Sequence, residues 1–380
     1  MKTNFLPFLA LLGALFSCVE DSQDVENQME VPSTYSFERD GASSVSFQGQ
    51  TDRLNMLSEI KTYLKAGDGG SELSSQKLLD MYANANEPFE NAELNASTKQ
   101  LENKTNPAEV DGFKQLLDQA AKVSADVAVN GTMAEDGVAG RISRGDDRYI
   151  NVNEKGWEFT QLVEKGLMGA VFYHQIFNVY LSDSKIGEGV DNEAIEEGKN
   201  YTTMEHHWDE AFGYWGVPTD FPNGDPVLDE EHSRFWAGYT YGLEETLGIN
   251  QPLMDAYIKG RAAIVADNHV VKNEQIDIII ELHELVAAAK AVHYIKSAIG
   301  DLNNQDTGNL FHHLSEGHGF IKAFGYSPNS NLSQAEINDI LNVDLGEDGN
   351  FWTVTPQGLQ NAKDKILNAY PELKEVEDEL

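Results

Sequence analysis

Apolar residues recur at three- and four-residue intervals through most of the chain, a spacing typical of helices that bury one face. Polar stretches, glycines and prolines separate these segments. The candidate over 153–181 is apolar on more than one side, which places it in the core of a helical bundle. We expect helices over residues 54–64, 74–83, 107–125, 153–181, 229–247, 251–271, 274–299, 310–326 and 356–370.

Two segments depart from the helical pattern. Residues 26–54 alternate between apolar and polar positions, with Gly41 and Gly49 as breaks, so we expect a short hairpin or an extended arm there. Residues 130–149 are rich in glycine and aspartate and are expected to form an extended loop.

A nine-residue pattern, His-His-x-x-Glu-x-x-Gly-aromatic, occurs twice in the chain. The first copy reads HHWDEAFGY at residues 206–214, and the second reads HHLSEGHGF at residues 312–320. The chain has ten histidines and two His-His pairs, and both pairs open this pattern, so composition alone does not explain the repeat. A sparse repeat of this kind marks a duplicated structural unit.

The repeat predicts the domain organisation. The sequence AVFY at residues 170–173 precedes the first copy, and the similar AVHY at residues 291–294 precedes the second. We therefore expect an all-α fold of two pseudo-symmetric halves, each like a four-helix bundle. The first would cover residues 35–250, including the N-terminal arm, and the second residues 251–380.

Each copy lies in a predicted helix, where residues three apart share a face. His207 should therefore project with Glu210, and His313 with Glu316. Such a pair could hold a divalent cation, iron or zinc, through one nitrogen and one oxygen ligand. It could equally be a carboxylate that fixes a buried histidine in the packing of the helices. The secondary candidates for the same site are His206, Asp209 and His312.

The N-terminus predicts export. Lys2 precedes an apolar run from Phe5 to Phe16, which has the length of a secretory signal and is too short to span a bilayer. The run ends at Cys18, the only cysteine, in a context that resembles a bacterial lipobox. We expect residues 1–17 to be a signal peptide and Cys18 to carry the lipid that anchors the protein in a membrane.

The residues after Cys18 are polar and acidic, so residues 18–34 are expected to form a disordered tether. Together, these features predict an outer-membrane lipoprotein of the cell envelope, displayed on either the periplasmic or the surface-exposed face of that membrane. The 63 acidic residues against 27 basic ones give a net charge of −36, which disfavours nucleic acid as a partner and permits cations.

Several enzyme classes are excluded by spacing. A zincin needs His-Glu-x-x-His, and the nearest match, His283-Glu284, has Ala287 in place of the second histidine. A ferritin-like di-iron site needs Glu-x-x-His on two helices, and no histidine here has a glutamate three residues before it. The chain also has no P-loop and no Gly-x-Ser-x-Gly elbow.

The sequence resembles an uncharacterised domain family of Gram-negative lipoproteins grouped with imelysin. The resemblance lies in the lipoprotein signal and in YSFERDGASSVSFQGQTDRLNML, HHWDEAFGYWG and YIKGRAAI, which begin at Tyr35, His206 and Tyr257. It implies an all-helical fold of two four-helix bundles and a Gly-x-His-x-x-Glu motif. His207 and Glu210 match that motif, whereas Glu205 stands in place of its glycine. Some imelysin-like proteins have been linked to iron uptake, and one founding member to peptidase activity.

Three functional hypotheses follow. The first is a binding protein for a metal ion or a metal-associated solute, with a possible link to iron uptake. The second is a metallopeptidase of the imelysin type, which would be sensitive to chelators. The third is a non-catalytic protein that docks on an outer-membrane transporter, for which neither copy of the motif needs to be exposed.

Overall fold

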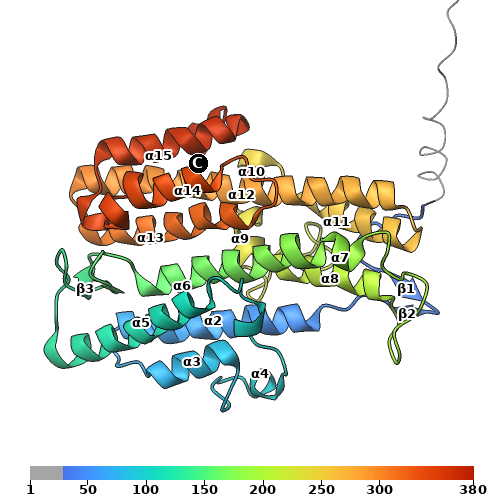
Figure 1. Ribbon diagram of the computed structural model, residues 1–380, viewed down its shortest axis with the longest axis horizontal. Helices are drawn as coiled ribbons and strands as arrows, with labels where there is room; N and C mark the ends of the chain where they lie inside the picture. The colour runs from blue at the N-terminus through green and yellow to red at the C-terminus, as the bar shows by residue number, and fades with distance from the viewer. Residues whose placement is uncertain (1–28) are drawn as a thin grey trace, which may run out of the picture.

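Helices dominate the computed structural model, which describes residues 29–380 (Figure 1). The all-α fold predicted from the apolar spacing is confirmed. The predicted signal peptide, Cys18 and most of the predicted tether lie outside the described residues. Among the described residues, no helix combines the length and the apolar character needed to cross a membrane.

The first part of the chain contains two small hairpins and a set of helices. β1 (Glu38–Arg39) pairs with β2 (Ala42–Ser43), and β3 (Gly140–Ser143) pairs with β4 (Tyr149–Val152), both antiparallel. The helices are α2 (Gln48–Asp68), α3 (Ser75–Ala83), α4 (Ala92–Ala96), α5 (Val110–Asn130), α6 (Phe159–Leu167), the π-helix η2 (Met168–Tyr180), α7 (Asp183–Ile186), α8 (Thr203–Trp215), α9 (Phe235–Tyr241) and α10 (Glu244–Leu247).

The second part is helical throughout. Its helices are α11 (Asn250–Val265), α12 (His269–Asn304), α13 (Thr307–Ala323), α14 (Gln334–Asp339), the short π-helix η4 (Ile340–Asp344) and α15 (Pro356–Ala369). Short 3-10 turns connect or end these helices, at Glu102–Lys104, Phe324–Tyr326, Glu347–Gly349, Phe351–Thr353, Pro371–Lys374 and Glu377–Glu379.

Several predicted boundaries are corrected. The helix predicted over 229–247 begins at Phe235 and is interrupted between α9 and α10, and the one predicted over 251–271 ends at Val265. The helix predicted over 153–181 begins only at Phe159, because the preceding residues form strand β4 and a turn. The loop predicted over 130–149 holds β3 and the start of β4, whose alternation is too short to stand out beside its glycines and aspartates. The segment predicted as a hairpin or extended arm over 26–54 contains the β1–β2 hairpin, but its residues from Gln48 onward belong to α2.

The longer helices run roughly along the long axis of the molecule (Figure 1). α2 packs against α5, α6 and α8, and α6 packs in turn against α13. α13 pairs with the 36-residue α12, which also contacts α11 and α15. The β1–β2 hairpin lies at one end of the molecule and the β3–β4 hairpin at the other.

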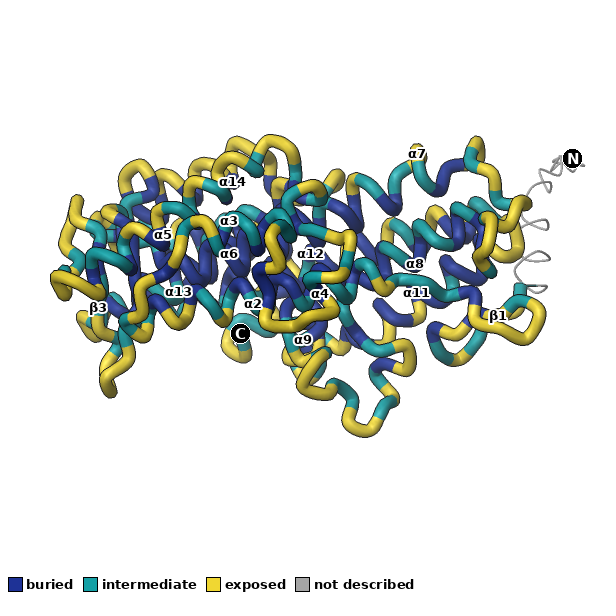
Figure 2. The backbone as a smooth tube through the Cα atoms, turned by 90° about the horizontal axis from the view of Figure 1, so that it is seen from below, coloured by how far each residue is buried: buried dark blue, intermediate teal, exposed yellow. Residues whose placement is uncertain are grey.

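A single hydrophobic core runs through the described residues. Buried apolar side chains from both predicted halves belong to one cluster, and Figure 2 shows the buried segments lining the middle of the molecule along its length. α6 belongs to the predicted first half and α13 to the second, and they are in direct contact. The pseudo-symmetry of the two halves stays a prediction.

Candidate functional site

The first copy of the motif lies on α8, a helix with well-defined ends. Thr202 and Glu205 form a capping box, in which each side chain bonds the backbone N–H of the other residue. Gly216 ends the helix with φ 86°, a left-handed conformation that favours glycine. Glu205 therefore caps the N-terminus of the helix that presents His207 and Glu210.

Buried ionic contacts tie this copy to the N-terminal arm. Asp209 is fully buried and accepts hydrogen bonds from the Tyr35 hydroxyl (2.8 Å), the Ser46 backbone N–H (2.9 Å) and Nε of Arg261 (3.1 Å). Burial raises the pKa of Asp209 to about 6, and the Arg261 charge and these hydrogen bonds oppose the rise. Glu205 pairs with Arg261 at 3.0 Å. Asp209, a secondary metal candidate, is thus part of a structural network.

The predicted His207–Glu210 pair is formed. His207 Nδ1 lies 3.1 Å from Glu210 Oε2, while Gln50 of α2 donates to Oε1 at 3.0 Å. Burial alone would raise the pKa of Glu210, but hydrogen bonds from His207, Gln50 and Tyr180 and the charge of His206 lower it to about 2. His206 donates from Nδ1 to the Ser46 carbonyl at 3.0 Å, so it too contacts the arm.

The second copy lies on α13 and makes a different set of contacts. His312 bridges two carboxyl groups, with Nδ1 2.7 Å from Glu158 and Nε2 3.3 Å from Glu316. His313 does not contact Glu316; its Nδ1 lies 2.5 Å from Asp301 of α12. In α8 the second histidine makes the closer contact with the motif glutamate, and His206 Nε2 also lies 4.0 Å from it. In α13 only the first histidine pairs with the motif glutamate among the described residues, because the second turns to Asp301.

Burial shifts the pKa values in the His312 bridge. It raises the pKa of Glu158 to about 8, with help from the nearby Glu316, and it lowers the pKa of His312 to about 3. Both shifts favour the uncharged form of the group, as expected where ionisable side chains are removed from water.

One arrangement is shared by both copies. A Cβ on Gly213 would lie 2.6 Å from Phe47 and 2.9 Å from Gln50, and a Cβ on Gly319 would lie 2.2 Å from the Cβ of Lys165. Each motif glycine thus marks the place where a second helix passes closely. That same helix also supplies the partner of the motif glutamate, Gln50 for Glu210 and Lys165 for Glu316.

The second copy borders a cavity of 720 Å³, which we call the basic cavity. It opens between α2, α6, α13 and the β3–β4 hairpin. Six of its lining residues are lysine or arginine, in a protein with a net charge of −36. The lining residues with ionisable side chains are Lys61, Lys65, Asp68, Arg141, Arg144, Asp147, Arg148, Tyr149, Glu158, Lys165, Tyr239, His312 and Glu316.

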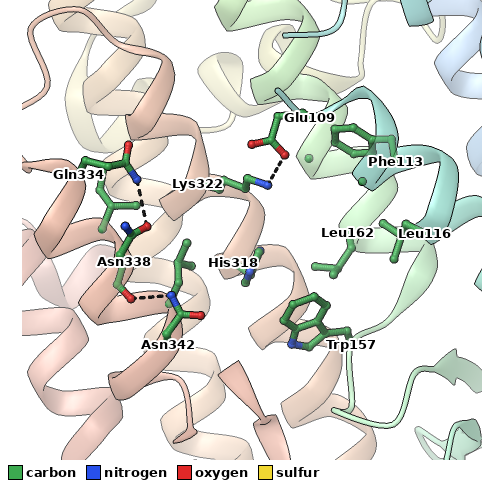
Figure 3. Close-up of a pocket in the computed structure, with 14 residues that line it drawn as sticks. Glu109, Phe113, Leu116, Trp157, Leu162, His318, Lys322, Gln334, Asn338 and Asn342 are labelled. Carbon is green, nitrogen blue, oxygen red and sulfur yellow. Dashed lines mark hydrogen bonds and ion pairs between the residues drawn. The ribbon is translucent and has the colours of Figure 1, made fainter. Parts of the chain in front are cut away.

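A second hollow of 440 Å³, the α13–α14 groove, is lined by residues of α5, α6, α13, α14 and η4 (Figure 3). Figure 3 shows Phe113 and Leu162 on one side and Asn338 on the other, with His318 between them. His318 packs against the Trp157 ring, with centroids 5.3 Å apart, and burial lowers its pKa to about 3. The groove is largely apolar, whereas the basic cavity is charged.

The surroundings of the two motif glutamates differ in charge. Among the residues that the structure describes, no group of three or more His, Cys, Asp or Glu side chains is arranged to hold a metal ion. In the first copy, His207 and Glu210 face each other and Gln50 turns its amide N–H toward the carboxylate. In the second copy, the Lys165 ammonium lies 3.6 Å from Glu316. A metal ion bound by this carboxylate would be repelled by the positive charge of Lys165.

Sequence reasoning missed the cationic residues of the β3–β4 hairpin. Arg141, Arg144 and Arg148 were hidden in a segment expected to be a loop. A signal was present, because three of the seven arginines of the chain fall within residues 141–148. In so acidic a chain, such a cluster indicates an anion-binding segment more strongly than the histidines indicate a cation site.

Comparison with known proteins gives a family but no named function. No curated protein and no solved structure matches the chain. Residues 32–371 match the family model described as a domain of unknown function, DUF4856. This match covers the arm, both copies of the motif and the lining of the basic cavity. The chain belongs to the DUF4856 family.

Proposed function

We propose that this protein is an outer-membrane lipoprotein that binds a small solute without transforming it, and that the basic cavity holds the solute. One observation carries the proposal: His312 and Glu316 of the second copy of the motif line the basic cavity. Ligand sites typically measure about 300–1,000 Å³, and the basic cavity measures 720 Å³. The first copy is instead filled by side chains and backbone from the N-terminal arm and α2.

A metal-associated solute is the ligand class that we favour. The resemblance to imelysin-like lipoproteins, some of them linked to iron uptake, supports it. Lys165 and the arginines of the β3–β4 hairpin disfavour a bare divalent ion in this cavity but accept a metal that arrives inside an anionic chelate.

The two copies of the motif provide a matched test of this proposal. The chain after Cys18 would be purified from an envelope extract and analysed by native mass spectrometry and elemental analysis, together with Glu316→Gln and Glu210→Gln. Both substitutions remove one charge and nearly keep the shape. We expect Glu210→Gln to retain a small solute as the wild type does, and Glu316→Gln to retain more of it, because this substitution removes the carboxylate that competes with an anionic solute for Lys165. Equal retention by both variants, or no solute on the wild type, contradicts the proposal.

Membrane anchoring is tested separately. If Cys18 carries the lipid, Cys18→Ala should move the full chain from the membrane fraction to the soluble fraction, because the described part of the chain offers no membrane-spanning helix. Cys18→Ser, which also removes the thiol, should behave in the same way. A variant that stays in the membrane fraction contradicts the lipoprotein proposal.

A further inference from the structure

We infer that the ligand of the basic cavity is a small oxyanion with at least two negative charges, carried on carboxylate or phosphate groups. The inference rests on the proposed function for the location of the site and adds the chemistry of the ligand. The observation behind it is that basic side chains from two separate parts of the fold line the same cavity. The β3–β4 hairpin contributes three arginines, and α2 and α6 contribute three lysines.

Most of these cations lack an ionic partner. Lys61 and Lys165 pair with Glu164, at 2.6 Å and 3.0 Å. Within the described residues, the other four cations of the cavity form no salt bridge: Lys65, Arg141, Arg144 and Arg148. Acidic residues outnumber basic ones 63 to 27 in this chain, so partners are abundant elsewhere on the molecule. Asp68, Asp147, Glu158 and Glu316 also line the cavity, so six basic side chains stand against four acidic ones and the formal charge of the lining is +2.

The arginines of the hairpin have N–H donors that a bound ligand could use. Arg144 uses Nε to hold Asn309 of α13 at 2.9 Å, which fixes its position beside the second motif. Arg141 lies over the Tyr149 ring at 4.1 Å, and its buried Nε has no hydrogen-bond partner among the described residues. An arginine fork matches the two oxygens of a carboxylate or phosphate, and stacking on an aromatic ring holds that fork in place.

The two-sided arrangement requires more than one negative charge. Lys65 approaches from the end of α2, whereas Arg144 approaches from the turn of the opposite hairpin. A monovalent anion could neutralise one side and would leave the other unpaired. A compact polycarboxylate or diphosphate can reach both sides, and a chelate with free carboxylates has the same outward chemistry.

Isothermal titration calorimetry on the chain after Cys18 tests this inference. The probes are citrate, inorganic pyrophosphate, acetate and zinc chloride, and the first two distinguish a carboxylate ligand from a phosphate ligand. We expect citrate or pyrophosphate to bind, with an affinity that falls as salt is raised, and acetate and zinc to give much weaker heats or none. Arg144→Gln and Lys65→Gln should each weaken binding by about tenfold or more.

Controls keep the test decisive. Lys65 is exposed, so Lys65→Gln should fold even if Arg144→Gln does not. Lys77→Gln removes the same charge from a surface pair with Glu90 and should leave binding unchanged. If Glu316→Gln alters retention of the co-purified solute and Glu210→Gln does not, but neither citrate nor pyrophosphate binds the wild type, the cavity stands as the site and the oxyanion class is wrong. Binding that Lys65→Gln and Arg144→Gln leave intact also overturns the inference.

Discussion

The fourth position of the motif is Asp209 in the first copy and Ser315 in the second. Asp209 brings the arm and Arg261 onto α8 through three buried hydrogen bonds. The Ser315 hydroxyl accepts only the backbone N–H of Glu158, at 2.9 Å. The N-terminal arm therefore packs onto the first copy, while the second copy lies beside an open, charged cavity. A duplicated motif can thus keep one helix-packing geometry and support two different environments.

The largest expected difference between the copies is in stability. Asp209→Ala should lower the free energy of unfolding by about 3–5 kcal/mol, because it leaves a buried arginine with one carboxylate fewer and two donors unpaired. Ser315→Ala removes a single neutral acceptor and should lower it by about 1 kcal/mol. Urea unfolding of both variants measures the difference. Equal losses would show that the first copy is not held together by the Asp209 network.

The two copies should also affect the stability of the fold in different pH ranges. The pKa of Glu210 is lowered to about 2, so its contribution is complete above pH 4.5 and is lost as the pH falls toward 2. The pKa of Glu158 is raised to about 8, so its contribution is complete below pH 4.5 and is lost as the pH rises through 8. Asp68, with a pKa raised to about 7, titrates in an overlapping range.

Two substitutions separate these contributions. Glu210→Gln should flatten the acid limb of a plot of unfolding free energy against pH, and Glu158→Gln should flatten the limb between pH 5 and 8. Each change should amount to roughly 2–3 kcal/mol across its range. The charged groups near Glu158, which include Arg144, Lys165 and Glu316, stay in place in both variants and serve as a common background. Unchanged limbs in both variants would contradict the assignment of protonation states.

A smaller effect tests what the copies share. Gly213→Ala and Gly319→Ala should each destabilise the fold by about 1–3 kcal/mol, because the new Cβ would meet Phe47 or Lys165 at less than 3 Å. Gly112→Ala is the control, since a Cβ there meets nothing within 4 Å. Melting temperatures measured by calorimetry report all three. A neutral Gly319→Ala would indicate that α6 and α13 can move apart without loss.

Sequence reasoning predicted the parts of the molecule that depend on local pattern. The all-α fold follows from apolar spacing, and the His207–Glu210 pair follows from the period of the helix. The partner of His313 could not be predicted in this way. Asp301 comes from the preceding helix, and its approach depends on how α12 is rotated against α13.

The basic cavity depends on long-range placement. Lys65, Arg144 and His312 are far apart in the sequence, and only the packing of α2, the β3–β4 hairpin and α13 brings them to one cavity. The arginine cluster at residues 141–148 could have been noticed, but no local rule says which helices surround it. In physical terms, the sequence reports the charge of the segment and the fold decides what that charge faces.

A crystal structure of the chain after Cys18 grown with citrate tests the central claim most directly. The account predicts citrate density in the basic cavity, within hydrogen-bonding distance of Arg144 and on the same side of α13 as His312. Density beside His207 and Glu210, or in the α13–α14 groove of Figure 3, with the basic cavity left to solvent, would contradict it.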